Sequence, residues 1–256
     1  MAELAKAAYF DDAEIAARRY RESLEFAEIL RLLGPSRGRA LDLGAGNGIL
    51  SWALAREGWS VTAVEPDPSD FIGAGAIRKM SADTKTPITV IEAFGEAIPV
   101  EDAGFDLIVA RQVLHHAKDL PAFCREMARL ARPGAKVLTL RDHVISNAAQ
   151  KPAFLDSHPL HRHYGGENAF TLAEYQGALQ STGIEIDRRF LSFQSVLNFD
   201  PSTPEEIFQK MAGLAGPLRR AVQFGLTTLP QGFGLSLAAL ADRRPGRLVS
   251  FLGHRP

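Results

Sequence analysis

Residues 40–50 read Ala-Leu-Asp-Leu-Gly-Ala-Gly-Asn-Gly-Ile-Leu, and this segment decides the fold. The apolar run 39–43 ends in a turn with glycines at three alternate positions, Gly44, Gly46 and Gly48. A strand followed by a glycine turn and a helix brings bare backbone close to a ligand. Asp42 adds a carboxylate near the turn, where it suits a cationic or amine-bearing ligand better than a pyrophosphate.

A second acid stands at the distance that ribose recognition requires. Glu65 closes the next apolar run, 60–64, about twenty residues downstream, where an acid usually holds the two ribose hydroxyls. A nicotinamide-dependent oxidoreductase shares these features, but its fingerprint needs a glycine at the sixth position, which is Ile49 here. This spacing and the charge of Asp42 disfavour the oxidoreductase, which stays the alternative enzyme class.

The glycine segment resembles the first motif of the class I S-adenosylmethionine-dependent methyltransferases, whose small-molecule branch fits best. Two later stretches resemble that family's third to fifth strands: 96–99 with 105–116, and 130–140. The resemblance covers roughly residues 35–190. It implies S-adenosylmethionine as the cofactor and methyl transfer to a small-molecule acceptor, at oxygen rather than at nitrogen or carbon.

Nucleic acid is not the expected partner. Family members that methylate amino groups of nucleobases carry Asn/Asp-Pro-Pro-aromatic after the fourth strand, where this chain has Ala-Arg-Gln-Val at 110–113. Methylation at C5 of cytosine needs a nucleophilic cysteine, and Cys124 is in the wrong place. The formal net charge of −1 also predicts no electrostatic footprint for nucleic acid.

The resemblance assigns roles in cofactor binding to strand ends. It implies that Gly44 and Gly46 approach the amino acid part of the donor, that Asp42 binds its ammonium directly or through water, and that Glu65 takes the ribose hydroxyls. The expected cofactor-binding residues are Asp42, Gly44, Ala45, Gly46, Glu65, Pro66, Phe94, Gly95, Arg111 and Gln112.

The adenine site departs from the family pattern. Similar enzymes commonly place Asp after the third strand, and Phe94 occupies that position. Glu92 or a backbone carbonyl could accept from the adenine amino group instead. Phe94 itself would lie against the purine or belong to the core. Arg111 and Gln112 end the fourth strand, under the sulfonium in the family.

Histidines gather after the fourth and fifth strands. His115 and His116 follow the fourth strand, His143 follows the fifth, and three more crowd the loop 158–163. Family analogy puts that loop over the acceptor pocket. Because imidazole titrates near neutral pH, a general base is expected from this set. The candidate catalytic residues are His116, His143 and His161.

The loop histidines His158, His161 and His163 have two other interpretations. They could bind zinc or another divalent metal that orients catechol-like oxygens. Their spacing matches no standard pattern and no second cluster completes it, so the sequence predicts no metal site. They could also be plain surface residues.

Short strands alternating with helices predict a doubly wound, mostly parallel α/β sheet of the Rossmann-like kind. Seven strands are expected, at about 39–43, 60–64, 88–92, 105–110, 136–140, 184–193 and 247–253, and the family resemblance makes the last one antiparallel. We expect a single methyltransferase domain. Its parts would be a helical cover at 1–34, a core at 35–198, a helical insertion at 199–245 and a last strand at 246–256.

Helix-capping patterns mark three helix starts. Asp11-Asp-Ala-Glu14 predicts a helix capped by Asp11 that runs to Gly34-Pro35. Thr171-Leu-Ala-Glu174 predicts another helix, reaching Gly183. The segment 200–206 has the form of a capped start for a helix in the insertion, which would act as a lid or partner surface.

Composition fits an ordinary globular chain of 256 residues. The single cysteine, Cys124, excludes an internal disulfide and is expected to be a buried thiol. No secretory signal and no apolar run of about eighteen residues occurs, so no membrane span and a cytoplasmic location are expected. A homodimer through the insertion is possible. Outside catalysis, the alternative is a cofactor-binding or partner-binding protein that keeps the fold without turnover.

Overall fold

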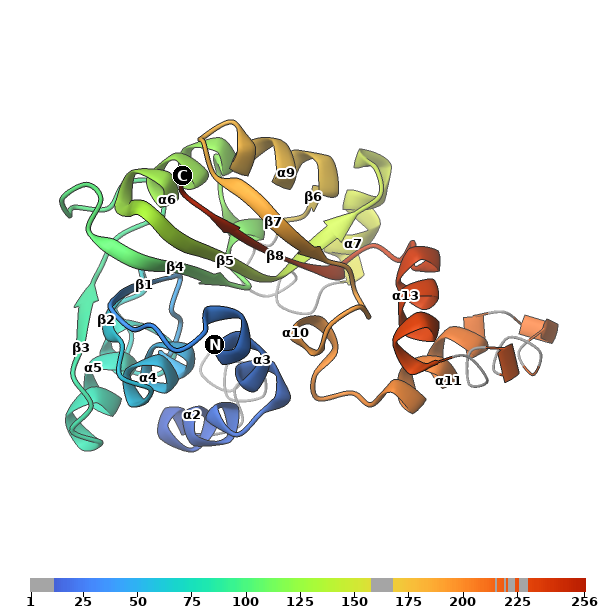
Figure 1. Cartoon of the computed structure of the whole chain (residues 1–256), viewed down its shortest axis with the longest axis horizontal. Coiled ribbons are helices and arrows are strands. Elements are labelled where there is room, and N and C mark those ends of the chain that lie inside the picture. Colours follow the sequence, from blue (N-terminus) through green and yellow to red (C-terminus); the bar gives the residue numbers. More distant parts are fainter. Residues whose placement is uncertain (1–11, 158–167, 215, 219, 221–223, 226–229) are drawn as a thin grey trace.

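One mixed sheet organises the chain in the computed structural model, which describes residues 12–157, 168–214, 216–218, 220, 224–225 and 230–256 (Figure 1). Its strand order is β3-β2-β1-β4-β5-β8-β7, and a short β6 pairs with β5 off this path. The strands are β1 Arg39–Leu43, β2 Ser60–Val64, β3 Ile88–Ile91, β4 Phe105–Arg111, β5 Ala131–Ile145, β6 Phe170–Thr171, β7 Glu185–Phe190 and β8 Arg247–His254. The prediction of a doubly wound, mostly parallel sheet is confirmed, and β6 is an addition to the seven expected strands.

Parallel pairing joins β1 to β2 and β4, β2 to β3, and β5 to β4 and β6. Only β8 runs antiparallel, and it lies between β5 and β7, as the family resemblance implied. The carboxyl ends of the parallel strands therefore meet at one edge, next to the start of β8. Ligands of doubly wound sheets bind at that edge.

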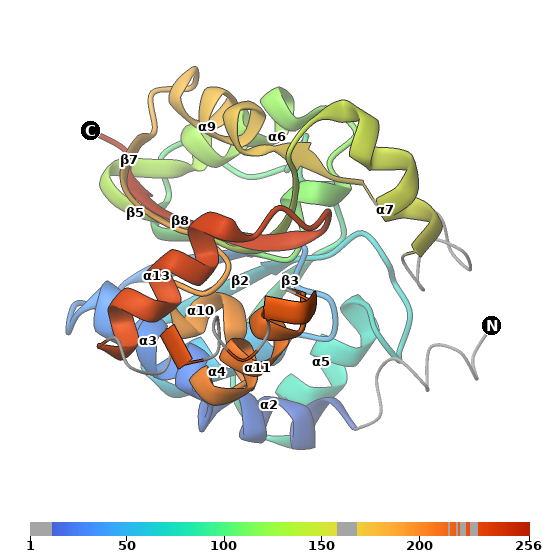
Figure 2. The same ribbon diagram turned by 90° about the vertical axis from the view of Figure 1, so that its right-hand side faces the viewer.

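Helices cover both faces of the sheet (Figures 1 and 2). The α-helices are α2 Ala13–Arg21, α3 Leu24–Leu33, α4 Ile49–Arg56, α5 Ala74–Asp83, α6 Leu120–Leu130, α7 Lys151–Ser157, α9 Leu172–Gln180, α10 Val196–Phe199, α11 Pro204–Leu214 and α13 Gln231–Ala241. Three short 3₁₀ turns are η1 Leu114–His116, η2 Ala148–Gln150 and η3 Gly216–Leu218. None of the helices in the described ranges is long and apolar enough to cross a membrane.

Two hydrophobic cores lie on the two faces. The face covered by α6 and α9 buries Phe123, Met127 and Tyr175 against the sheet. The opposite face buries Phe26 and Leu54 from α3 and α4. Cys124 is buried in the first core, as expected, and burial raises the pKa of its thiol to about 12.

The N-terminal cover differs from the prediction because the chain forms two helices instead of one. Ser23 interrupts the predicted helix, and its hydroxyl accepts the N–H of Phe26 to cap α3. Asp12 caps α2 by accepting the N–H of Glu14, so the prediction of Asp11 as the cap is wrong by one residue; Asp11 lies outside the described residues. The local pattern therefore predicted a cap at the start of the first helix, but it did not predict the second cap at Ser23, which divides the segment into two helices.

The fifth strand is also longer than predicted. The predicted strand covers 136–140, but α6 ends at Leu130 and β5 begins directly after it, at Ala131. Gly134, at φ +76°, donates its N–H to the carbonyl of Arg255, which keeps this segment on the sheet. At the other end, β5 continues through Arg141, Asp142 and His143 because β8 pairs with it there.

The segment between β7 and β8 is helical. Thr203 and Glu206 form a reciprocal capping pair at the start of α11, and Thr171 with Glu174 does the same for α9, which ends at Gln180 rather than at Gly183. α11 and α13 pack on each other and project to one side of the sheet, while α10 packs against α3 (Figure 1).

Candidate functional site

The glycine turn after β1 presents bare backbone to open space. Gly44, Gly46 and Gly48 have φ values of +62°, +57° and +80°, a region that favours glycine. A Cβ on Gly44 would lie 2.2 Å from the Cγ2 of Val113, whereas a Cβ on Gly46 would meet nothing within 4 Å. The first position thus forbids a side chain, and the second leaves room for a ligand against the backbone.

Two acids brace this turn. Glu65, at the end of β2, accepts the N–H of Gly46 at 2.8 Å through Oε2 and the N–H of Asp67 at 3.0 Å through Oε1. Burial raises its pKa. Asp42 is only 1% exposed and accepts the Ser51 hydroxyl at 2.6 Å. Burial raises the pKa of Asp42 to about 7, so this carboxyl titrates near neutrality.

A cavity of about 140 Å³ opens beside the turn, and we call it the glycine-side cavity. Phe94 lines it and is 61% exposed, so the interpretation of Phe94 as a core residue is wrong. The Nζ atom of Lys118 lies 5.2 Å from the Phe94 ring centroid. Glu92, by contrast, pairs with Arg78 at 2.6 Å. The lining residues are Gly44, Pro66, Ala93, Phe94, Gly95, Glu96, Val113, His116, Ala117, Lys118 and Phe123.

Three histidines and a buried acid pack together next to this cavity, and we call them the histidine cluster: His115, His116, Asp142 and His143. The centroid of the His115 ring lies 4.3 Å from the centroid of the His116 ring and 4.6 Å from that of the His143 ring. Asp142 Oδ1 lies 3.0 Å from Nδ1 of His115 and also accepts its backbone N–H. Since a carboxylate accepts, His115 carries its proton on Nδ1 and its basic nitrogen is Nε2.

The third ring is fixed in the same way. Nδ1 of His143 lies 3.0 Å from the carbonyl oxygen of Gly246, which can only accept, so the neutral ring keeps Nε2 as its basic nitrogen. Tyr175 donates its hydroxyl to the His143 carbonyl at 2.9 Å. The cluster is therefore held from the sheet, from the start of β8 and from α9.

A β-bulge gives β5 its polar residues at this point. Thr139 pairs with Phe251 and Asp142 with Val249, so β5 has one more residue than β8 across this interval. Arg141 occupies the bulge at φ +59° and donates its N–H to the Ser250 hydroxyl at 3.0 Å. A bulge redirects side chains, and here it places Arg141 and Asp142 at the carboxyl edge.

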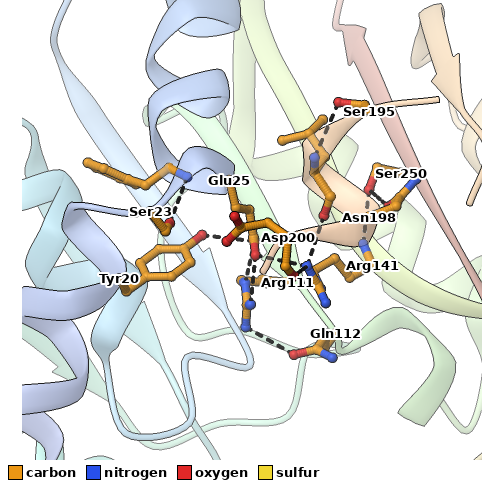
Figure 3. A network of polar contacts seen from close by, with 12 residues as sticks. Tyr20, Ser23, Glu25, Arg111, Gln112, Arg141, Ser195, Asn198, Asp200 and Ser250 are labelled. Atoms are coloured by element: carbon orange, nitrogen blue, oxygen red, sulfur yellow. Dashed lines mark hydrogen bonds and ion pairs between the residues drawn. The ribbon is translucent and has the colours of Figure 1, made fainter. Parts of the chain in front are cut away.

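Glu25 of α3 joins the ends of β4 and β5 (Figure 3). Its carboxylate accepts from Nε and Nη2 of Arg111 at 2.7 and 3.0 Å and from Nη1 of Arg141 at 3.1 Å. Tyr20 donates its hydroxyl to the same carboxylate at 3.0 Å. Glu25 is 2% exposed, so one buried carboxylate serves two guanidiniums.

A larger cavity, of about 360 Å³, lies on the far side of Arg141, and we call it the insertion-side cavity. Gly246 lines it, and the Gly246 carbonyl oxygen lies 3.0 Å from Nδ1 of His143, so one hydrogen bond links the histidine cluster to the wall of this cavity. Its lining residues are Arg141, Phe193, Asn198, Phe199, Asp200, Pro201, Ser202, Glu206, Ile207, Lys210, Arg244, Pro245, Gly246, Arg247 and Leu248.

The structure thus gathers five of the thirteen sequence-predicted residues around one cavity: Gly44, Pro66, Phe94, Gly95 and His116. Asp42 and Ala45 lie under or within the turn, and the Ala45 N–H binds the Val64 carbonyl. Gln112 has φ +54° and accepts from Nη1 of Arg111 at 3.0 Å. His158, His161 and His163 lie outside the described residues.

Sequence reasoning gave no role to two residues of the site, Glu25 and Asp142. Two signals pointed to them. Glu25 is a charged residue beside the apolar stripe of its helix, and Arg141-Asp142-His143 interrupts an otherwise apolar strand. Neither signal identifies the partner that each side chain meets.

Comparisons with known proteins agree with this geometry. A family model described as a methyltransferase domain matches residues 16–188. The chain is 30% identical over 152 residues to a ubiquinone biosynthesis O-methyltransferase of Methylobacterium nodulans, a match that covers 57% of this chain and 59% of that protein. A ubiquinone biosynthesis O-methyltransferase of Rhizobium johnstonii is 26% identical over 195 residues, covering 74% and 77%. The first match spans less than two thirds of the relative's length.

Two solved structures share the fold. A geranyl diphosphate C-methyltransferase from Streptomyces coelicolor A3(2), in complex with Mg²⁺, geranyl diphosphate and S-adenosylhomocysteine, has a TM-score of 0.60 at 15% identity and covers 91% of this chain and 80% of its own. A phosphoethanolamine N-methyltransferase from Haemonchus contortus, in complex with phosphomonomethylethanolamine and S-adenosylhomocysteine, has a TM-score of 0.59 at 19% identity, covering 91% and 52%.

Glu25→Ala tests the bridge between α3 and the sheet. The change leaves two largely buried guanidiniums without the carboxylate that they share, so the free energy of unfolding should fall by about 3–5 kcal/mol. The matched control is Glu28→Ala on the same helix, whose partner Arg31 is exposed and whose loss should cost about 1 kcal/mol or less. Chemical denaturation measures both, and equal losses would contradict the shared role of Glu25.

Proposed function

Because this chain belongs to the class I S-adenosylmethionine-dependent methyltransferases, we propose that it transfers a methyl group to a hydroxyl oxygen of a small-molecule acceptor. The observation that carries the proposal is the histidine cluster, which lies between two cavities at the carboxyl edge of the sheet. Methyl transfer to a hydroxyl needs a group that accepts its proton, and transfer to an amine or a carbon does not explain such a cluster as directly.

The glycine turn, together with the glycine-side cavity beside it, offers contacts for S-adenosylmethionine, the cofactor of this family. In the turn, Gly46 leaves room for the amino acid part, and each oxygen of Glu65 keeps a lone pair for a ribose hydroxyl. The exposed Phe94 ring offers a face for the purine in place of the usual Asp. We assign the ammonium to Asp42, acting through the turn or a water, because the carboxyl itself is buried.

The remaining residues of the predicted set keep supporting roles in this proposal. Ala45, Pro66 and Gly95 shape the wall of the glycine-side cavity and its turn. Arg111 and Gln112 bound the space under the sulfonium from the end of β4. Glu92 is engaged by Arg78, so a backbone carbonyl is the better acceptor for the adenine amino group.

The cofactor supplies a methyl group that its sulfonium has already activated, so the chain has to align the acceptor and accept a proton. We assign the base to His116 or His143, with His115 and Asp142 as the pair that holds them. His116 lines the glycine-side cavity and stacks on His115, and Asp142 places a carboxylate behind that ring. A base that becomes cationic is stabilised by a nearby carboxylate.

Other functions have less support. The family model that matches this chain is a methyltransferase domain, which does not favour a nicotinamide-dependent oxidoreductase. The fingerprint of that class also needs a glycine at its sixth position, where this chain has Ile49. A cofactor-binding protein without turnover gives no reason for a histidine cluster at the methyl-transfer edge. The name ubiquinone biosynthesis O-methyltransferase, which both curated relatives carry, supports oxygen as the acceptor atom.

We keep the division of the chain as a proposal: the helical cover at 1–34, of which the structure describes 12–34, and the insertion at 199–245 flank one methyltransferase core. The insertion is also the proposed contact of a homodimer, because Phe233, Leu237 and Leu240 expose apolar side chains on α13. Sedimentation of the full chain decides this point, and a monomer at high concentration would refute it.

Ligand-dependent unfolding tests the proposed function directly. S-adenosylhomocysteine at a hundred times its dissociation constant should stabilise the native state by about 2.7 kcal/mol. For a chain of this size that is roughly a 5–10 °C rise in Tm. NAD should give no shift under the same conditions. The reverse pattern would favour the oxidoreductase, and no shift with either ligand would refute cofactor binding.

The affinity for S-adenosylhomocysteine should rise with pH. Burial raises the pKa of Asp42 to about 7, and an ammonium ligand binds only its ionised form, so affinity should increase by roughly eightfold from pH 6 to pH 7.5 and then level off. Without ligand the free energy of unfolding should fall as pH rises from about 4 to about 7, because the native state holds a proton that the unfolded chain releases.

Calorimetric titration of Asp42→Asn checks this assignment. The Asn side chain can still accept the Ser51 hydroxyl, so the turn should persist while the pH dependence disappears. An unchanged dependence in the variant would place the titrating group elsewhere, for example in the histidine cluster.

Turnover should depend on the histidine cluster more than cofactor binding does. His116→Ala should lower kcat by about 100-fold or more, the usual contribution of a general base, and should leave the Kd of S-adenosylhomocysteine nearly unchanged. Asp142→Asn should lower kcat and shift the acid limb of its pH profile. His254→Ala is the matched control, since His254 pairs with Asp187 at the other end of β8. S-adenosylhomocysteine release measures turnover, and full activity in His116→Ala and His143→Ala would remove the cluster from the mechanism.

A further inference from the structure

The insertion-side cavity has more positive charge than its own acids neutralise. Four cationic side chains line it, with only two acids, Asp200 and Glu206. Both acids are already engaged by backbone: Asp200 accepts from the first N–H groups of α3, and Glu206 accepts the Thr203 N–H at 2.8 Å. The cations are Arg141, Lys210, Arg244 and Arg247.

Arg141 keeps one edge of its guanidinium unused. Among the described residues, it donates only through Nη1, to Glu25 Oε2 at 3.1 Å and to the carbonyls of Asp200 at 2.9 Å and Leu197 at 3.3 Å. Its Nε is buried and has no hydrogen-bond partner in that part of the chain. Nη2 of Arg141 donates no hydrogen bond within that part of the chain and is not among its fully buried, unpartnered atoms, so Nη2 is the nitrogen that can meet an oxyanion in the cavity.

The other cations differ in how far they are neutralised. Arg244 binds Asp242 through two hydrogen bonds, at 2.8 and 2.9 Å, and is satisfied. Arg247 donates through Nη1 to the Ser146 hydroxyl and to backbone carbonyls, and no carboxylate in the described ranges pairs with it. Lys210 is exposed on α11 and forms no ion pair within those ranges.

The cavity wall also has an apolar part. Phe193, Phe199, Ile207 and Leu248 contribute aromatic and aliphatic side chains. A ligand that satisfies both parts of the wall has an apolar skeleton and an anionic group. The cavity volume of about 360 Å³ lies in the range of small-molecule sites.

We propose that the insertion-side cavity binds an organic oxyanion on an apolar skeleton, and that this anionic compound is the methyl acceptor. Nη2 of Arg141 binds the oxyanion from the sheet side, and Arg247 and Lys210 complete the contact from β8 and α11. The oxyanion is a carboxylate or a phosphate ester. Its role as acceptor rests on the proposed methyltransferase function, while its binding does not.

Binding of three matched probes to the full chain tests the subsite: 4-hydroxybenzoate, 4-hydroxyphenyl phosphate and 4-hydroxybenzamide. They share a phenol and differ in the charge of the second substituent. At constant ionic strength, with and without S-adenosylhomocysteine, at least one anion should bind about tenfold tighter than the neutral amide. The preferred anion identifies carboxylate or phosphate. Equal binding of the amide, or no binding of either anion at millimolar concentration, would overturn the proposal.

Single substitutions locate the site. Arg247→Gln and Lys210→Gln should each weaken the preferred anion, Arg247→Gln by about tenfold or more, and leave the amide unaffected. Lys79→Gln removes the same charge from an exposed site on α5, which packs on β3 at the other end of the strand order, and should change nothing. Arg141→Gln would also remove the hydrogen bonds from Arg141 to Glu25 and to the carbonyls of Leu197 and Asp200, so a loss of binding in that variant could come from a loosened fold. The result for Arg247→Gln therefore decides. An unaltered affinity in Arg247→Gln would place the anion elsewhere.

Methylation assays separate this inference from the function on which it rests. The anionic phenols should be turned over with a lower KM than the amide, and Arg247→Gln should raise that KM while kcat changes less. If S-adenosylhomocysteine does not bind, the proposed function fails, although the titration without it still tests the anion site. If the cofactor binds and the amide is the better acceptor, the inference alone fails.

Discussion

The carboxylate of Glu25 is the constraint on which the carboxyl edge of this fold depends. It is buried, and it binds Arg111 from β4, Arg141 from β5 and Tyr20 from α2 (Figure 3). Buried charges are tolerated only when they are paired and hydrogen-bonded, so α3 cannot leave the sheet without depriving two largely buried guanidiniums of the carboxylate that they share.

The bulge in β5 extends this constraint to the insertion. Arg141 donates to the carbonyls of Leu197 and Asp200, and its own N–H binds Ser250, whose hydroxyl donates to Asn198 at 2.6 Å. The amide of Asn198 in turn donates to the Phe190 and Leu191 carbonyls. α10 is therefore fixed to β5, β7 and β8 at once, and the helices that follow it start from a defined point beside the cleft.

What the sequence could predict was the part of the fold that depends on short-range pattern. The bounds of β1 and β2 match the apolar runs because their register follows from neighbouring residues, and the glycine turn follows from steric rules that act on one residue at a time. Ser23 shows the limit of this reasoning. Nothing in the local pattern indicated that Ser23 would end one helix and cap a second one, α3.

The histidines marked the region of the site, but its organisation comes from distant contacts. Glu25 meets Arg111 across 86 residues and Arg141 across 116, and His115 meets Asp142 across 27. No periodicity connects such positions. The bulge that turns Arg141 and Asp142 toward the cleft depends on β8, which lies more than a hundred residues further along the chain.

This difference in origin separates the two halves of the cleft. The proposed cofactor half is built from backbone and from two acids that brace it, so its chemistry is largely set by local geometry. The proposed acceptor half is built from side chains that also hold the fold together. Arg141 supplies positive charge to the insertion-side cavity and anchors α10, so under this proposal a change of acceptor charge cannot begin there without loosening the insertion. Within the described residues, Arg247 and Lys210 form no ion pair with a carboxylate, and a shift toward neutral acceptors would therefore begin at these two rim positions while the Glu25 bridge stays intact.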